Sequence, residues 1–228
     1  MRHPEPARRE RHVYRTLAPL TRAELPGWPL HTTAPQAATL GELGGRLQVG
    51  DTIFVRVRLL PFRKVAETTR SWTNHVGIVV DLADGEPVIA EGRIPFSGTT
   101  TWARFVRRSE DGRVALARLK TALDAGQQAA LLEAARKRYR IPYDPGFNLH
   151  SRRQFCSRFV REVVDEAAGV KLGEVERFCD LLARNPQADR RFWRLWYLGA
   201  IPWQRETVTP ASLLRDERLH IYFDGNVE

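Results

Sequence analysis

Residues 75–92 constrain the fold more than any other stretch, because they combine two apolar runs with a turn signal. The runs are HVGIVVDL (75–82) and EPVIAEG (86–92), and the ADG between them is typical of a tight β-turn. Successive residues of a strand point to opposite sides of a sheet. One face of the first run therefore carries Val76, Ile78, Val80 and Leu82, and the other carries His75, Gly77, Val79 and Asp81. The stretch predicts a hairpin within an antiparallel sheet.

Other periodic stretches extend this sheet and add helices. Alternation over residues 50–59 and 113–120 predicts two further strands. Apolar residues at helical spacing predict helices over 123–139, 156–169 and 175–184, and a last short helix near Thr209 or Pro210. Thr39 and Glu42 have the spacing of a capping box before a short helical turn. Residues 63–72 are polar and are predicted to form a loop. The fold class is therefore α+β.

The length of the chain suits one domain with an appended segment. It has 228 residues, of which 43% are hydrophobic, enough for a sizeable core. Residues 1–38 are rich in Pro and Arg and are predicted to be a basic N-terminal extension, followed by a single domain over 39–228. No run of 18 apolar residues and no apolar core of a signal peptide is present, so no transmembrane segment and a cytoplasmic location are expected.

The net charge of +9 raises the question of an anionic partner. Only four of the 36 basic residues are lysines, a balance that codon bias also produces, and the charge is spread along the chain. No stretch resembles an RNP or helix-turn-helix motif, so nucleic acid is not expected as a partner. A non-catalytic basic module that binds phosphate-rich partners stays open as an alternative.

The two cysteines, Cys156 and Cys179, lack the CxxC or Cys/His spacing of a metal site, so neither a metal nor a disulfide is expected. Cys156 lies in the first turn of its predicted helix, where free N–H groups and the helix dipole stabilise a thiolate. Arg152 and Arg153 add positive charge nearby. Cys179 falls in the middle of its predicted helix, as a core cysteine would. Cys156 is therefore the candidate nucleophile, with a buried core cysteine as the alternative reading.

His75 is the candidate base, because histidine can take the proton of a thiol and return it to a leaving group. A third polar group usually orients such a base, and Glu91 is the nearest candidate. Glu91 shares a face with His75 only if the hairpin contains an extra residue. We predict that Gly85 supplies a bulge that pairs Leu82 with Glu86 and sets position 77 opposite Glu91. Without a bulge, Ile78 would lie opposite Glu91, which would then face away.

The segments GDTIF, NHVGIVV, VIAEG, FCSRFV and PW…TVTPASLL, with a Tyr-containing loop before the cysteine, together resemble a known family. They are similar to the circularly permuted papain-like cysteine hydrolases of the NlpC superfamily, most closely the YiiX/YebB-like branch. The resemblance covers roughly residues 45–215. It implies a small antiparallel sheet or half-barrel packed on the cysteine helix, with the histidine strand before that helix in the chain.

The resemblance also implies roles for particular residues. Cys156 matches the nucleophile, His75 the base and Glu91 the polar third member; Asn74 and Arg158 stand where the family often has Ser and Glu. The implied mechanism is attack of the thiolate on an acyl carbonyl, formation of a covalent thioester, and release of the acyl group to water or another acceptor. The N–H of Cys156 is an expected oxyanion donor, with Asn74 and Tyr143 as candidates for a second one. No cofactor is implied.

The substrate is not fixed by this fold. We expect a small-molecule, peptide or lipid acyl substrate, and hydrolysis of an amide or ester bond. Acyl transfer or phospholipase activity on lipid or acyl-carrier substrates is the enzymatic alternative. Trp193, Trp196 and Trp203 are expected to form core and cleft wall and not a lipid-binding surface. The sequence carries no signal for the oligomeric state.

Overall fold

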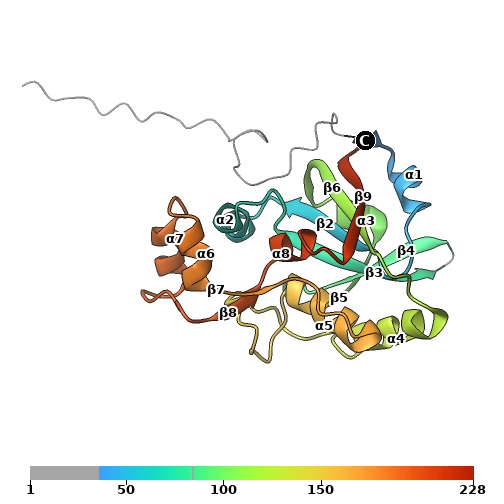
Figure 1. The fold of residues 1–228 in the computed structure, drawn as a ribbon. Helices are drawn as coiled ribbons and strands as arrows, with labels where there is room; N and C mark the ends of the chain where they lie inside the picture. Colours follow the sequence, from blue (N-terminus) through green and yellow to red (C-terminus); the bar gives the residue numbers. More distant parts are fainter. Residues whose placement is uncertain (1–35, 84) are drawn as a thin grey trace, which may run out of the picture.

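A seven-stranded, mostly antiparallel sheet forms the centre of the computed structural model, which describes residues 36–83 and 85–228 (Figure 1). The strand order is β1-β9-β6-β2-β3-β4-β5, and the β1–β9 pair is parallel. The strands are β1 (Gln36–Ala38), β2 (Thr52–Val57), β3 (His75–Ala83), β4 (Glu86–Glu91), β5 (Gly98–Thr101), β6 (Ser109–Leu119) and β9 (Leu219–Val227). A separate two-stranded sheet pairs β7 (Val175–Arg177) with β8 (Glu206–Val208).

Helices cover both faces of the large sheet. They are α1 (Leu40–Gly44), α2 (Leu60–Thr69), α3 (Trp102–Val106), α4 (Ala125–Arg136), α5 (Cys156–Ala168), α6 (Phe178–Arg184), α7 (Arg190–Trp196) and α8 (Pro210–Leu214). One core joins α4 and α5 to the face of β3 that carries Ile78. A second core joins α1 and α3 to the opposite face, which carries Val79. Burial of both faces explains why the apolar run of β3 is nearly continuous. An α+β fold with an antiparallel sheet against α5 is confirmed.

The hairpin of β3 and β4 is confirmed, but its turn differs from the prediction. Ala83 pairs with Glu86 and Leu82 with Pro87, so two residues and not three connect the strands. Gly85 does adopt a left-handed conformation, with φ of 81°. The predicted pairing of Leu82 with Glu86, and with it the bulge at Gly85, is therefore wrong. A two-residue turn with positive φ already matches the twist of the strands, so no extra residue is needed there.

The extra residue lies further along β3, at Val80. The pairs on either side of it are Val79–Ile89 and Asp81–Val88. This shift sets Ile78 opposite Ala90 and not opposite Glu91. The register that brings Glu91 to the same face as His75 is thus present, produced by a bulge five residues before the predicted one.

Several predicted elements change in the structure. Residues 63–72, predicted to be a loop, lie mostly in α2, which has proline at its start and ends at Arg70 in a left-handed conformation. The helix predicted over 175–184 is instead strand β7 followed by α6. The α5 helix and its left-handed end at Gly169 (φ 69°) are as predicted, and so is the capping box of Thr39 and Glu42. Strands β5 and β9 and helix α3 were not predicted.

Most of the predicted N-terminal extension, residues 1–35, lies outside the described residues. Its last three residues form β1, which pairs with β9. The division into an extension over 1–38 and a domain over 39–228 stays a prediction. In the part of the chain that the structure describes, no helix is long and apolar enough to cross a membrane.

Candidate active site

Cys156 is the first residue of α5 and is buried, with 3% of its surface exposed. The preceding residue, Phe155, is the N-cap and provides no side-chain hydrogen bond, and no side chain among the described residues caps the N–H groups of the first turn. Apolar residues at i, i+3 and i+4 hold the rest of α5 against the sheet; they are Phe159, Val160, Val163 and Val164. These residues therefore place a thiol at a helix N-terminus whose backbone donors are free.

Gly92 allows α5 to approach the end of β4. A Cβ atom at this position would lie 2.8 Å from the carbonyl carbon of Phe155 and 3.0 Å from the backbone nitrogen of Cys156. Gly77, on the same face of β3 as His75, does not make room for α5. A Cβ at Gly77 would instead meet Ile89 and Phe105, which belong to the core that contains Val79. The close approach thus depends on the glycine that directly follows Glu91.

His75 and Glu91 form a buried pair. Nε2 of His75 donates to Oε2 of Glu91 at 2.6 Å, and the side chains are 3% and 0% exposed. The other carboxylate oxygen, Oε1, accepts from Nη2 of Arg108 at 2.7 Å and lies 3.8 Å from Nε of Arg93. Glu91 therefore orients the imidazole while Arg108 holds the carboxylate. Arg108 was not predicted, because a long side chain that reaches from another part of the chain leaves no local pattern.

Besides Glu91, the ring of His75 interacts with Cys156. Nδ1 has no hydrogen-bond partner of good geometry among the described residues. Burial lowers the pKa of His75, but the neighbouring Cys156 and Glu91 outweigh it and raise the pKa to about 9. Burial also raises the pKa of Glu91, but the His75 and Arg108 charges outweigh this and hold it below its usual value. The imidazole thus lies between two groups that favour its protonated form.

The two candidate oxyanion donors differ in what they contact. Burial, followed by the proximity of Cys156, raises the pKa of Tyr143 well above its usual value, so its buried hydroxyl stays protonated beside the thiol. The Asn74 amide bonds the backbone of Val57 at both ends: Oδ1 accepts from the N–H at 2.7 Å, and Nδ2 donates to the carbonyl at 3.0 Å. Tyr143 therefore places its hydroxyl beside the thiol, whereas Asn74 ties the start of β3 to the end of β2.

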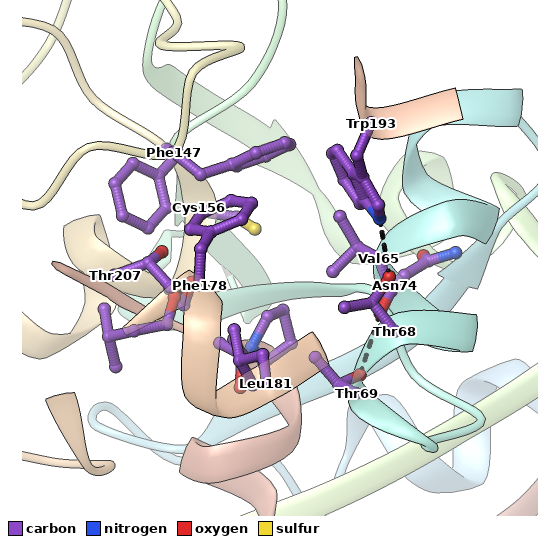
Figure 2. A pocket seen from close by; sticks show the side chains of 15 residues that line it. Val65, Thr68, Thr69, Asn74, Phe147, Cys156, Phe178, Leu181, Trp193 and Thr207 are labelled. Carbon is purple, nitrogen blue, oxygen red and sulfur yellow. Dashed lines mark hydrogen bonds between the residues drawn. The ribbon is translucent and has the colours of Figure 1, made fainter. Parts of the chain in front are cut away.

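A narrow apolar pocket opens beside the sulfur of Cys156 (Figure 2); its outline encloses about 430 Å³, which includes space open to solvent. Its walls come from α2, the start of α5, and the segment from α6 to α8. They include Val65, Thr68, Thr69, Phe147, Phe178, Leu181, Trp193 and Thr207. Figure 2 shows the sulfur pointing into the space between Phe178 and Val65. The thiol therefore lies in the wall of an apolar pocket.

The tryptophans of the C-terminal half have three different environments. Trp193 is buried, lines the pocket and donates through Nε1 to Oγ1 of Thr68 at 2.8 Å, which joins α7 to α2. Trp196 is half-buried and stacks on Phe192. Trp203 is 44% exposed. The expected role as core and cleft wall holds for Trp193, but Trp203 lies at the surface.

Cys179 lies in the first turn of α6 and not in mid-helix, and it is partly exposed. Its thiol contacts Oδ1 of Asp180 at 3.4 Å. The predicted mid-helix position of Cys179 is wrong because residues 175–177, predicted to be helical, form strand β7. Across residues 36–83 and 85–228, no three His, Cys, Asp or Glu side chains are grouped so that they could hold a metal ion.

A helix that begins with a cysteine and packs on an antiparallel sheet bearing a histidine is the papain-like arrangement. In this chain the histidine strand precedes the cysteine helix, which is the permuted order. The chain belongs to the C92 family of permuted papain-like amidases, YaeF/YiiX, whose family model matches residues 46–222. This confirms the predicted class of protein, while its placement in the NlpC superfamily and beside YebB stays a prediction.

Two relatives agree with this assignment. The chain is 26% identical over 168 residues to the uncharacterized protein YiiX of Escherichia coli K12, covering 73% of this chain and 81% of the relative. A crystal structure titled metalloprotein YiiX, from Escherichia coli O157:H7, superposes with a TM-score of 0.72 at 25% identity. It covers 78% of this chain and 97% of that one. The fold and the family are thus shared over most of both chains.

Proposed function

We propose that this protein is a cysteine amidase that uses Cys156, His75 and Glu91 as a catalytic triad. The observation that carries the proposal is the position of His75, buried between the carboxylate of Glu91 and the thiol of Cys156 at the start of α5. Membership of a family of papain-like amidases supports an enzyme over a non-catalytic basic module. The family description is that of an amidase, and it gives no separate support to acyl transfer.

In the proposed mechanism the thiolate of Cys156 attacks the carbonyl carbon of an acyl substrate. The C–N bond breaks, and the amine leaves with the proton carried by His75. A water molecule then attacks the thioester, gives a proton to His75 and displaces the thiolate as the acid is released. Glu91 keeps Nε2 of His75 protonated and leaves Nδ1 facing the sulfur, while Arg108 fixes the Glu91 carboxylate.

The oxyanion of the tetrahedral intermediate would accept from the N–H of Cys156 and from the hydroxyl of Tyr143. The first turn of α5 has no side-chain cap that competes for its N–H groups. The raised pKa of Tyr143 keeps its hydroxyl a donor throughout the working range of the enzyme. Asn74 is the weaker candidate, because its amide already bonds both backbone groups of Val57.

The related crystal structure carries the word metalloprotein in its title, which raises the question of whether this chain could also hold a metal ion. The described side chains of this chain do not fit one: Oε2 of Glu91 bonds His75, Oε1 bonds Arg108, and no third ligand joins His75 and Cys156. The proposed steps therefore use only side chains and water.

Alkylation by iodoacetamide near neutral pH tests the proposal, because a thiolate reacts and a thiol does not. Cys156 should be labelled at least tenfold faster than Cys179, although Cys179 is the more exposed of the two. His75→Ala should slow labelling of Cys156 and leave Cys179 unchanged. Mass spectrometry of digested protein gives both rates. Equally slow labelling of the two cysteines in the folded protein would overturn the proposal.

Activity should follow the same residues. A panel of amide, ester and thioester acyl donors, tested with the native protein, identifies the acyl group that is cleaved. Cys156→Ser should abolish turnover, and Cys179→Ser is the matched control that should retain it. A mass shift of Cys156 by one acyl group, removed by hydroxylamine, would report the thioester.

A further inference from the structure

A second cavity adjoins the apolar pocket at Cys156. The two share Thr68, Thr69 and Leu181 in their walls, so these three residues lie between them. Figure 2 shows Thr69 and Leu181 at one end of the apolar pocket, with Phe147 and Trp193 at the other. We call the second cavity the arginine vestibule, because its lining includes Arg70, Arg184 and Arg215 as well as Glu176 and Asn185. It contains about 670 Å³ of space.

The arginine vestibule has an excess of positive charge. Arg184 forms an ion pair with Glu176, whose other oxygen accepts from the hydroxyl of Thr209. Among the described residues, Arg70 and Arg215 have no carboxylate partner; Nε of Arg215 donates to the carbonyl of Ala211. One glutamate therefore balances one of three guanidinium groups, and two remain available to a ligand.

The positive charge does not continue outward. The groove beyond shares Glu176, Arg184 and Arg215 with the vestibule, and its further lining is mostly acidic: Glu174, Asp216 and Glu217, with Arg218 paired to Asp216. An anion would therefore be favoured between the apolar pocket and this acidic rim, and disfavoured further out. The arginine vestibule is therefore a cationic zone next to the apolar pocket that contains Cys156.

We propose that the arginine vestibule binds an anionic group of the substrate, a carboxylate or a phosphate, while an apolar portion fills the pocket and presents the scissile carbonyl to Cys156. The proposal rests on the proposed function and deepens it. Guanidinium groups offer forked donors that match the oxygens of both anions. The apolar walls next to Cys156 contain no charge that could bind a polar substrate there. The enzyme would therefore be specific for a substrate that is apolar near its reactive bond and carries a negative charge further away.

Chloroacetamides with an alkyl spacer test this directly, because they alkylate Cys156 and carry a chosen end group. Spacers of increasing length end in a carboxylate, a phosphonate, a methyl group or a trimethylammonium group. At the spacer length that spans the pocket, an anionic end should raise the rate of alkylation about tenfold over methyl, as expected for hydrogen bonds to a charged group. The larger of the two anionic effects identifies carboxylate or phosphate as the preferred group.

Variants assign the effect to the vestibule. Arg70→Gln combined with Arg215→Gln should bring the ratio of anionic to methyl rates close to one, and Arg215→Glu should favour the trimethylammonium end. Arg63→Gln is the control, since Arg63 is exposed on the same helix as Arg70 and lines neither cavity. It should leave the ratio unchanged.

Two readouts keep this inference separate from the proposed function. The iodoacetamide rate of Cys156 relative to Cys179 reports thiolate reactivity alone, whereas the end-group ratio is independent of the absolute rate. A ratio near one for the native protein at every spacer length would overturn the vestibule even if iodoacetamide reacts rapidly. So would an anionic preference that survives the Arg70→Gln and Arg215→Gln changes.

Discussion

His75 is protonated over a wider range of pH than an exposed histidine, because Cys156 and Glu91 both raise the pKa of one buried ring. Its pKa of about 9 lies above the usual 6.5. The imidazolium therefore stabilises the folded protein fully below about pH 6.5, and this contribution is lost as the pH rises through 9. In the proposed mechanism the leaving amine takes its proton from this ring, so catalysis should share the upper limit. We expect kcat/KM for an amide to fall above about pH 9.

Glu91→Gln should move this alkaline limit to lower pH, because the carboxylate that favours the imidazolium is removed while the burial remains. A shift of about one pH unit or more is expected from loss of a contacting carboxylate. Glu110→Gln is a suitable control, since Glu110 pairs with Arg56 on another part of the sheet. The pH profile of kcat/KM and an NMR titration of His75 measure the shift. An unchanged limit in Glu91→Gln would contradict a role for Glu91 in holding the base.

At the scale of elements, the distance between the end of β4 and the start of α5 sets the position of the thiol. Gly92→Ala places a Cβ within 3.0 Å of the α5 backbone, which must then move. We expect a loss of about 1–3 kcal/mol in the free energy of unfolding. We also expect a fall of up to roughly 10²-fold in kcat/KM, since displacement of a reacting group by about 1 Å has that effect.

Gly41→Ala, in α1, is the matched control for this substitution. A Cβ at Gly41 meets nothing within 4 Å, and alanine favours a helix over glycine by roughly 1 kcal/mol. This variant should be at least as stable as the native protein and equally active. Urea unfolding and steady-state kinetics compare the two variants. If Gly92→Ala were as active as Gly41→Ala, close packing at β4 would not position Cys156.

The elements that were predicted correctly are those whose apolar residues follow a single helical or strand spacing. Helix α5 and strand β3 were predicted because each buries a regularly spaced set of apolar side chains, which is visible in the sequence. Helix α2 escaped prediction because polar residues outnumber its buried apolar ones, Phe62 and Ala66. The bulge at Val80 was misplaced, since a bulge depends on both strands and not on one. Arg108 could not be predicted, because its contact with Glu91 exists only in the folded sheet.

At the scale of the whole molecule, Asp51 connects three strands of the sheet. It is fully buried just before β2 and accepts from Arg118 of β6, the hydroxyl of Tyr222 of β9 and the N–H of Gln48. Asp51→Asn removes the charge and leaves Arg118 without its partner. We expect a loss of about 2 kcal/mol or more in the free energy of unfolding. Activity per folded molecule should not change, because Asp51 does not line the pocket at Cys156.

Asp111→Asn provides the comparison for Asp51. Asp111 forms an ion pair with Arg58, but its side chain is 80% exposed, and asparagine tolerates its left-handed conformation. A change within about 0.5 kcal/mol is expected for this exposed pair. Urea unfolding of both variants measures the difference. If Asp51→Asn and Asp111→Asn had equal free energies of unfolding, the buried contacts of Asp51 would not stabilise the sheet more than an exposed ion pair does.

The order of segments along the chain has a consequence during synthesis on the ribosome. His75, Glu91 and Cys156 emerge first, whereas α6, Trp193 and strand β8, which wall the pocket, follow. Strand β9, which pairs with β6, emerges later still. A domain folds as a unit, so the residues of the candidate site come together with the walls of the pocket only once the C-terminal third has left the ribosome. An unfinished polypeptide of this protein would thus hold Cys156 without the partners and the pocket of the folded molecule, and completing the chain assembles them together.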